Sequence, residues 1–263
     1  MSQITSRRNP LVTRCRALAH DATADEILLD GFHLVFEASA AGVAVLHAIV
    51  AREALGRVEI RRLVEQLTAR GTNVAFAASA VMDAVSPVRS ASDIVAIASR
   101  PVSDVERVYG GDVPLVLVAA DVQDPGNLGA MVRVAEAGGA SGVIAAGTAA
   151  SPWSWKALRG SMGSAFRLPI ATHDHCAHAV EDARRHGCRI VATVPRNGRS
   201  HFDADLSGPV AIMIGSEGTG LASEIVEAAD LRIAIPMKAP VESLNAAVAA
   251  ALLIYEACRQ RTQ

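Results

Sequence analysis

The chain has 263 residues, 51% hydrophobic and only 3% aromatic, so two domains are expected, with cores built mainly from alanine, valine, leucine and isoleucine. A formal net charge of −2 does not indicate an overall basic nucleic-acid binder, and any such contact must use local patches. The four cysteines form no CxxC pair, no apolar stretch reaches the ~20 residues of a membrane span, and no signal peptide is seen, so we expect a soluble cytoplasmic protein.

The first hundred residues have a mixed α/β pattern. Apolar spacing predicts a helix over 11–20, a strand at 27–29, a helix from Phe32 and a strand around 44–50. Further alternation continues up to a strand at 94–98.

A run of arginines stands near the N-terminus, namely Arg7, Arg8, Arg14 and Arg16. Such a run is a candidate patch for nucleic-acid phosphates. An acidic stretch over 21–30 cancels its charge, and an ordinary solvated terminus explains the run equally well.

The second half alternates short apolar strands with helices, the pattern of a parallel sheet covered by helices. The predicted strands are 115–119, 142–146, 189–194, 210–214 and 231–235. The predicted helices are 128–137, 177–186, 221–228 and 243–259. The stretch 99–114, with two prolines and the Gly110-Gly111 pair, is interpreted as a connector, so we predict domains over 1–105 and 106–263.

The loops after the strands deserve most weight, because open α/β sheets bind ligands beyond the carboxyl ends of their strands. The first is DVQDPGNLGAMVRVAEAGGA, residues 121–140. Residues 124–126 predict a turn, Asn127 a helix N-cap, and Gly129 and Arg133 share one helix face. A neighbouring carboxylate or a subunit interface is an alternative partner for Arg133.

Two further loops carry glycines and polar residues. GSEGTGL, residues 215–221, places Glu217 among glycines that let backbone approach a ligand, although an ordinary turn would also use them. It lacks the glycine order of a dinucleotide site and the lysine of a phosphate loop. In IPMKAPVESLNAAVAAALLIYEA, Ser243 and Asn245 can cap the last helix or reach into a site.

Two clusters allow alternative interpretations. His173, His175, Cys176 and His178 could hold a metal, but their spacing fits no standard zinc signature, so we expect no metal. In SPWSWKALRGSMGSAFRLP, the cations Lys156, Arg159 and Arg167 alternate with aromatic residues. That pattern suits phosphate contacts and base stacking, or equally aromatic packing at a subunit interface.

Three motifs together resemble the SpoU (TrmH-type) branch of the SPOUT RNA methyltransferases: DPGNLGAMVRVAEAGGA, IMIGSEGTGL and IAIPMKAPVESLNAAVAAALLIYE. They occur in the order and spacing of that family, and SMGSAFRLP between the first two is also similar. ITSRRNPLV, LLDGFHLVFEA and VSPVRSASDIVAIA resemble the L30e-like substrate-binding domain that precedes many of these enzymes. The resemblance covers nearly the whole chain.

The resemblance implies an α/β fold in which a C-terminal SPOUT domain, with a parallel sheet and a deep trefoil knot, follows a smaller L30e-like RNA-binding domain. It also implies a homodimer whose shared face completes each site. By motif position, S-adenosylmethionine would contact Gly215, Ile235 and Leu244, largely through backbone, with Thr193 and Gly218 nearby.

The same positions imply a catalytic group of Asn127, Arg133, Glu217, Ser243 and Asn245. An arginine keeps its charge, so we expect Arg133 to stabilise the developing alkoxide and the adjacent phosphate rather than to act as a plain base. Contacts to RNA are then expected from four arginines: Arg7, Arg8, Arg159 and Arg167.

The function predicted from the resemblance is S-adenosylmethionine-dependent methylation of an RNA ribose 2′-hydroxyl. The chain lacks long basic terminal extensions, which favours ribosomal RNA of the large subunit over transfer RNA. A non-catalytic RNA-binding protein on the same scaffold is the alternative from another class. A nucleotide-dependent oxidoreductase is disfavoured because the dinucleotide fingerprint is missing.

Overall fold

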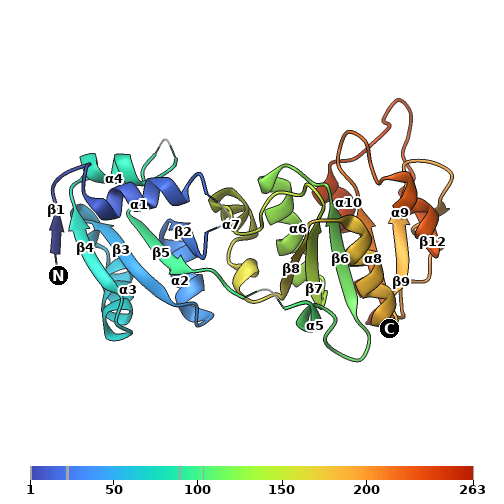
Figure 1. Cartoon of the computed structure of the whole chain (residues 1–263), viewed down its shortest axis with the longest axis horizontal. Coiled ribbons are helices and arrows are strands. Elements are labelled where there is room, and N and C mark those ends of the chain that lie inside the picture. Colours follow the sequence, from blue (N-terminus) through green and yellow to red (C-terminus); the bar gives the residue numbers. More distant parts are fainter. Residues whose placement is uncertain (1, 22–23, 89, 103, 263) are drawn as a thin grey trace. The chain divides into compact units, whose positions relative to one another are not determined.

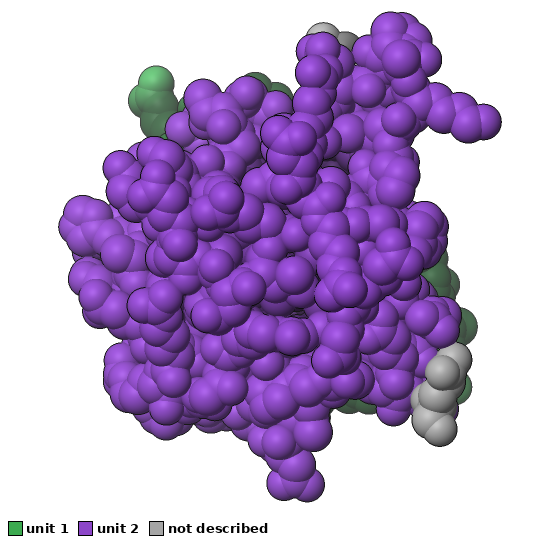
Figure 2. Space-filling model, turned by 90° about the vertical axis from the view of Figure 1, so that its right-hand side faces the viewer, with its two compact units in different colours: residues 1–102, 153–166 green, residues 103–152, 167–263 purple. Residues whose placement is uncertain are grey.

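The computed structural model describes residues 2–21, 24–88, 90–102 and 104–262. The chain forms two compact units, the first made of residues 1–102 and 153–166 and the second of residues 103–152 and 167–263. Figure 1 shows that each unit has a β-sheet of its own, and Figure 2 shows the surface of the second unit in purple. Every helix among the described residues is too short or too polar to span a bilayer.

The first unit is built on a five-stranded mixed sheet of order β1-β4-β3-β5-β2. Its strands are β1 (Ser2–Ile4), β2 (Glu26–Asp30), β3 (Val45–Ala51), β4 (Asn73–Ala77) and β5 (Ile94–Ser99). Its helices from the first hundred residues are α1 (Pro10–Leu18), α2 (Phe32–Ala40), α3 (Val58–Ala69) and α4 (Ser79–Val85), with the 3₁₀ turn η1 (Arg52–Gly56). Helices cover both faces of this sheet (Figure 1). The elements predicted up to residue 98 are confirmed.

A segment from the middle of the chain belongs to the first unit. It contains α7 (Trp155–Ser161) and the 3₁₀ turn η2 (Ser164–Phe166). Arg159 Nη1 lies 3.2 Å from Oδ2 of Asp30, whose side chain is fully buried and also accepts a hydrogen bond from Ser86 Oγ at 2.8 Å. A buried carboxylate requires such partners, so this ion pair fixes α7 against β2.

The second unit contains a seven-stranded sheet of order β10-β12-β9-β11-β6-β7-β8, parallel throughout. Its strands are β6 (Leu115–Ala120), β7 (Gly142–Ala146), β8 (Ile170–His173), β9 (Arg189–Thr193), β10 (Arg199–Ser200), β11 (Val210–Ile214) and β12 (Leu231–Ala234). All five predicted strands are confirmed, and β8 and β10 are additional. Strands β6, β7 and β11 are buried along their whole length, as expected for parallel strands covered on both faces.

Two groups of helices cover this parallel sheet. The helices are α5 (Val105–Val108), α6 (Pro125–Ala137), α8 (Cys176–Arg185), α9 (Ser223–Ala228) and α10 (Ala246–Arg261). Side chains of α5, α8 and α9 share an apolar cluster with alternate residues of β6, including Val116 and Val118. Helices α6 and α10 pack closely. Gly138, at the end of α6, allows this approach, since a Cβ there would lie only 2.3 Å from Cγ2 of Ile254 on α10.

The stretch interpreted as a connector, 99–114, turns out to contribute to the core. Val108 and Tyr109 are buried in the apolar cluster of the second unit. The Tyr109 ring stacks on His186 at 4.2 Å between centroids, and His186 Nε2 lies 3.0 Å from Glu106 Oε2. Short helix α5 is therefore part of the second unit. The prolines and glycines on either side of it led to the prediction of a connector, although Val108 packs in the core.

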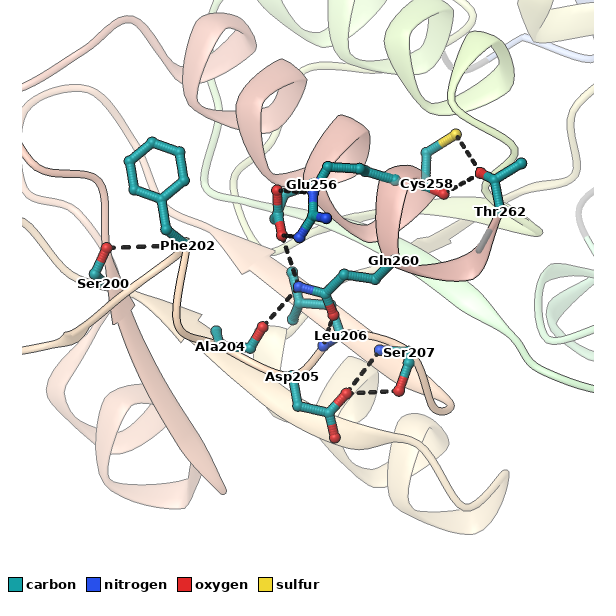
Figure 3. A network of polar contacts seen from close by, with 11 residues as sticks. Ser200, Phe202, Ala204, Asp205, Leu206, Ser207, Glu256, Cys258, Gln260 and Thr262 are labelled. Atoms are coloured by element: carbon teal, nitrogen blue, oxygen red, sulfur yellow. Dashed lines mark hydrogen bonds and ion pairs between the residues drawn. The ribbon is translucent and has the colours of Figure 1, made fainter.

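Polar contacts anchor the loop before β11 to the end of α10 (Figure 3). Gln260 Nε2 donates to Ala204 O at 2.8 Å, and Leu206 N donates to Gln260 Oε1 at 2.6 Å. Glu256 accepts hydrogen bonds from Arg259 and Gln260, each at 2.7 Å. The hydrogen bond from Arg259 lowers the pKa of Glu256 to about 2.

The trefoil knot that the family resemblance implies for the second unit stays a prediction.

Candidate active site

A cavity of about 560 Å³ lies at the carboxyl ends of β9, β11 and β12. Its volume is in the range of small-molecule sites, and its position is where parallel sheets bind ligands. Apolar side chains of Ile214, Val226 and Ile233 contribute to its walls. Three loops complete the lining, with residues 193–196 and 215–221 and, from the third loop, Ile235, Met237, Glu242, Ser243 and Leu244.

All five residues expected to contact the cofactor line this cavity: Thr193, Gly215, Gly218, Ile235 and Leu244. The two glycines have different physical reasons to be there. A Cβ on Gly215 would lie 2.2 Å from the backbone carbon of Gly220, so only glycine permits this fold of the loop. A Cβ on Gly218 would meet nothing within 4 Å, so that position leaves open space.

The loop 215–221 has a defined internal structure. Ser216 and Gly220 form an isolated antiparallel bridge, and Ser216 Oγ lies 2.8 Å from Thr219 Oγ1. Thr193, on the neighbouring strand end, donates its hydroxyl proton to Met213 O at 2.9 Å. Backbone and side-chain contacts thus fix two walls of the cavity.

Hydrogen bonds join the three sequence motifs at one edge of the cavity. Asn127 Nδ2 donates to Glu217 Oε1. Asn245 Nδ2 donates to Asn127 Oδ1 at 2.9 Å. One residue from each motif, 90 and 118 positions apart along the chain, therefore takes part in a single polar chain.

The partners at the two ends of this series of hydrogen bonds determine how the side-chain amides of Asn127 and Asn245 are oriented. Asn245 Oδ1 accepts from the backbone N–H groups of Ala247 and Val248 at 3.0 and 3.3 Å. Its Nδ2 must then face Asn127, which accepts with its oxygen and is left to donate to the Glu217 carboxylate. The second N–H of Asn245 Nδ2 stays available for a substrate atom.

Two predicted helix starts require correction. The N-cap of α6 is Asp124, whose Oδ1 accepts from Asn127 N at 2.8 Å, so Asn127 lies in the first turn. Pro125 is the first helical residue, where its missing N–H has no hydrogen bond to lose. Likewise α10 begins at Ala246 with Asn245 as its cap, rather than at Ser243.

Arg133 and Ser243 make fewer contacts within the protein than Asn127, Glu217 and Asn245 do. Ser243 is exposed and lines the cavity. Arg133 is exposed on α6 and does not belong to the cavity lining. Within the described part of the chain neither side chain has a hydrogen-bond or ion-pair partner, so the alternative of a neighbouring carboxylate for Arg133 finds no support there.

The arginines expected to contact RNA mostly have partners inside the protein. Arg7 Nε donates to Ala80 O at 2.9 Å, and Arg8 is exposed. Arg159 pairs with buried Asp30, and Arg167 binds both carboxylate oxygens of Glu136, at 2.6 and 2.9 Å. Their contact with RNA stays a prediction.

The aromatic and histidine clusters can also be placed. Trp153 is only 6% exposed, so it packs within the first unit and is not available for base stacking. His173 Nε2 lies 2.7 Å from Asp182 Oδ2, and the His178 ring meets the His173 and His175 rings edge-on. The described residues contain no group of three side chains arranged to hold a metal ion.

The cavity has two charged residues that were not among the expected site residues. Arg196 follows β9 and Glu242 precedes Ser243, and both line the cavity. Arg196 Nη2 lies 3.0 Å from Glu242 Oε1. Their distance along the chain, 46 positions, explains why neither was identified from sequence.

Comparisons with known proteins agree with this geometry. The model of the SpoU rRNA Methylase family matches residues 114–255. The 23S rRNA (guanosine(2553)-2′-O)-methyltransferase RlmP of Bacillus subtilis is 30% identical over 97% of this chain and 98% of its own. The 23S rRNA (uridine(2479)-2′-O)-methyltransferase of Streptomyces viridochromogenes is 32% identical over 88% of this chain and 84% of its own.

Solved structures are similar over the same extent. The SpoU methyltransferase AviRb from Streptomyces viridochromogenes, in complex with the cofactor AdoMet, has a TM-score of 0.88 and 29% identity, covering 97% of this chain and 99% of its own. An AdoMet-bound rRNA methyltransferase from Sinorhizobium meliloti has a TM-score of 0.86 and 28% identity, covering 98% and 97%.

Proposed function

Because this chain belongs to the SpoU rRNA Methylase family, we propose that it methylates a ribose 2′-hydroxyl of large-subunit ribosomal RNA with S-adenosylmethionine. The observation that carries the proposal is the polar chain from Glu217 through Asn127 to Asn245 beside the cavity. Single loops of this kind have structural explanations, whereas three motifs joined by hydrogen bonds at a ligand-sized cavity form a site.

The choice of ribosomal RNA is supported by two relatives that match both units of this chain. Both are named as 23S rRNA methyltransferases. A structure described as methylating C/U34 on tRNA covers only 58% of this chain, with a TM-score of 0.53. Transfer RNA is therefore the alternative substrate. The first unit would supply the surface that selects RNA by shape, and the enzyme would act in the cytoplasm.

The cavity fits S-adenosylmethionine by volume and by its combination of apolar walls and polar loops. Thr193, Gly215, Gly218, Ile235 and Leu244 would hold it. When bound, the cofactor supplies a methyl group on a positively charged sulfonium. The protein must then place the ribose oxygen in line with that methyl group and stabilise the charge that develops on the oxygen.

The residues beside the cavity divide these tasks. Asn245 offers its remaining Nδ2 N–H, and Ser243 its hydroxyl, to orient the ribose. Glu217 holds Asn127, which in turn holds Asn245. The Arg133 guanidinium, free of partners among the described residues, would stabilise the developing alkoxide and the adjacent phosphate.

The catalytic role of Arg133 is tested by comparing Arg133→Ala and Arg133→Lys with the wild type. We expect Arg133→Ala to lower methyl transfer to 23S rRNA by about 100-fold or more. Cofactor affinity measured by calorimetry should stay unchanged, because Arg133 lies outside the cavity lining. Arg133→Lys should recover only part of the rate, since a lysine lacks the planar fork. Near-normal turnover of Arg133→Ala would remove it from the catalytic group.

A homodimer is supported by an exposed apolar face on α10. Val248, Leu252 and Tyr255, spaced by four and three positions, share one side of this helix and are 48%, 40% and 54% exposed. Phe202, 67% exposed, borders a second cavity of about 400 Å³ together with Leu252 and Tyr255. A contiguous apolar face of this kind indicates a protein contact, and a two-fold dimer buries the same face twice.

A further inference from the structure

We propose that Arg196 recognises the carboxylate of the cofactor's amino-acid group, and that Glu242 faces the ammonium of the same group. This inference rests on the proposed function. It makes the Arg196–Glu242 pair the part of the cavity that selects a whole amino-acid nucleoside over its truncated forms.

The charges of the cavity lead to this assignment. S-adenosylmethionine has one carboxylate, one ammonium and one sulfonium group. Among the residues that line the cavity, three carry a charge: Arg196, Glu217 and Glu242. Glu217 is already bound by Asn127. Arg196 is therefore the cation of the lining that can pair with a carboxylate, and Glu242, which lies beside Arg196, is the carboxylate placed to meet the neighbouring ammonium.

The positions of the two residues suit a zwitterion. Arg196 comes three residues after Thr193, and Glu242 comes two residues before Leu244, both expected cofactor contacts. Their side chains meet at 3.0 Å and so bring opposite charges side by side. An amino-acid group presents the complementary pair of charges at a similar spacing.

The backbone that carries Arg196 is fixed. Asn197 has a φ of 59°, and a Cβ on Gly198 would lie 2.7 Å from the backbone carbon of Ile233. The loop is thus pressed against β12, while the Arg196 and Glu242 side chains remain 73% and 79% exposed. A guanidinium has five N–H donors, so Arg196 can bind a second carboxylate without losing Glu242.

Three ligands separate this role from a general effect on the cavity. S-adenosylmethionine and S-adenosylhomocysteine both contain the amino-acid group, whereas 5′-methylthioadenosine lacks it. Titration calorimetry on the full-length protein should show that Arg196→Met weakens the first two by about 10-fold to 100-fold and leaves the third unchanged. Arg196→Lys should give an intermediate loss, and Glu242→Gln should weaken the same two ligands.

A matched control is Arg199→Met, because Arg199 is also exposed and close in sequence but does not line the cavity. It should bind all three ligands as the wild type does. If the wild type binds S-adenosylmethionine and Arg196→Met binds each of the three ligands with the affinity of the wild type, the inference is wrong while the proposed function stands. A uniform loss of all three ligands, or a loss of RNA binding with cofactor binding intact, would also overturn it. Failure of the wild type to bind S-adenosylmethionine would instead contradict the proposed function.

Discussion

Asn245 shows how one residue serves both the helix and the site. Its Oδ1 caps α10, and its Nδ2 reaches Asn127 in another motif. A cap needs only an acceptor, whereas the link to Asn127 needs a donor. The two roles can therefore be separated by changing the amide to a carboxylate.

We predict that Asn245→Asp keeps the stability of the wild type and loses activity. A carboxylate still accepts from Ala247 and Val248 and is favoured at a helix N-terminus, but it cannot donate to Asn127. Urea unfolding should give a free energy close to that of the wild type, while methyl transfer falls by about 10-fold or more.

Asn245→Ala is the matched control, because it removes the cap as well. It should lower the free energy of unfolding by about 1 kcal/mol. Full turnover by Asn245→Asp would show that the hydrogen bond to Asn127 has no part in the reaction.

Arginines illustrate a second point at the scale of residues. A run of cations predicts affinity for phosphate, but Arg159 forms an ion pair with Asp30, and Arg167 forms one with Glu136. Ion pairs of this kind depend on which carboxylates the fold brings near. Sequence spacing does not contain that information.

At the scale of elements, the end of α10 and the loop before β11 act together (Figure 3). Glu256 is only 8% exposed and accepts from Arg259 and Gln260, and Gln260 holds the backbone of Ala204 and Leu206. These contacts favour the ionised carboxylate, so its pKa falls from an ordinary value near 4.5 to about 2.

We predict that this carboxylate contributes to stability above pH 4.5 and that the contribution is lost as pH falls toward 2. The sign follows because the unfolded chain takes up the proton first, at the higher pKa. Between these values the free energy of unfolding should fall more steeply for the wild type than for Glu256→Gln. Parallel slopes for the two proteins in urea unfolding at pH 6, 4 and 3 would contradict the assigned pKa.

At the scale of the whole molecule, three passes of the chain connect the two units, at residues 102–103, 152–153 and 166–167. The exposed face of α10 belongs to the second unit, which also contains the cavity. A dimer formed through this face would place two copies of the catalytic unit together.

We predict that Leu252→Glu converts a dimer into a monomer, since it puts a charge in the middle of the apolar face. Sedimentation velocity measures the change directly. Val102→Glu is the control, because Val102 is 89% exposed but belongs to the first unit. A wild type that sediments as a monomer, or a Leu252→Glu variant that stays dimeric, would exclude this face as the interface.

Local sequence was enough to predict strands β6, β7, β9, β11 and β12 of the second unit and the loops that form its site, but not β8, β10 or α5. Apolar runs such as 115–119 and 210–214 specify buried parallel strands by themselves, and the loops after such strands must meet at one sheet edge. Within these loops, the resemblance of the motifs implied individual residues that line the cavity, including Gly215 and Leu244, but not Arg196 or Glu242.

Only the tertiary structure decided which side chains form ion pairs and hydrogen bonds with one another across long distances in the sequence. Residues 153–166 belong to the first unit because Arg159 meets Asp30, 129 positions away in sequence. Asn127 bonds Glu217 and Asn245 across 90 and 118 positions, and Arg196 meets Glu242 across 46. Such contacts depend on how the strands are ordered in the sheet, which periodicity along the chain does not encode.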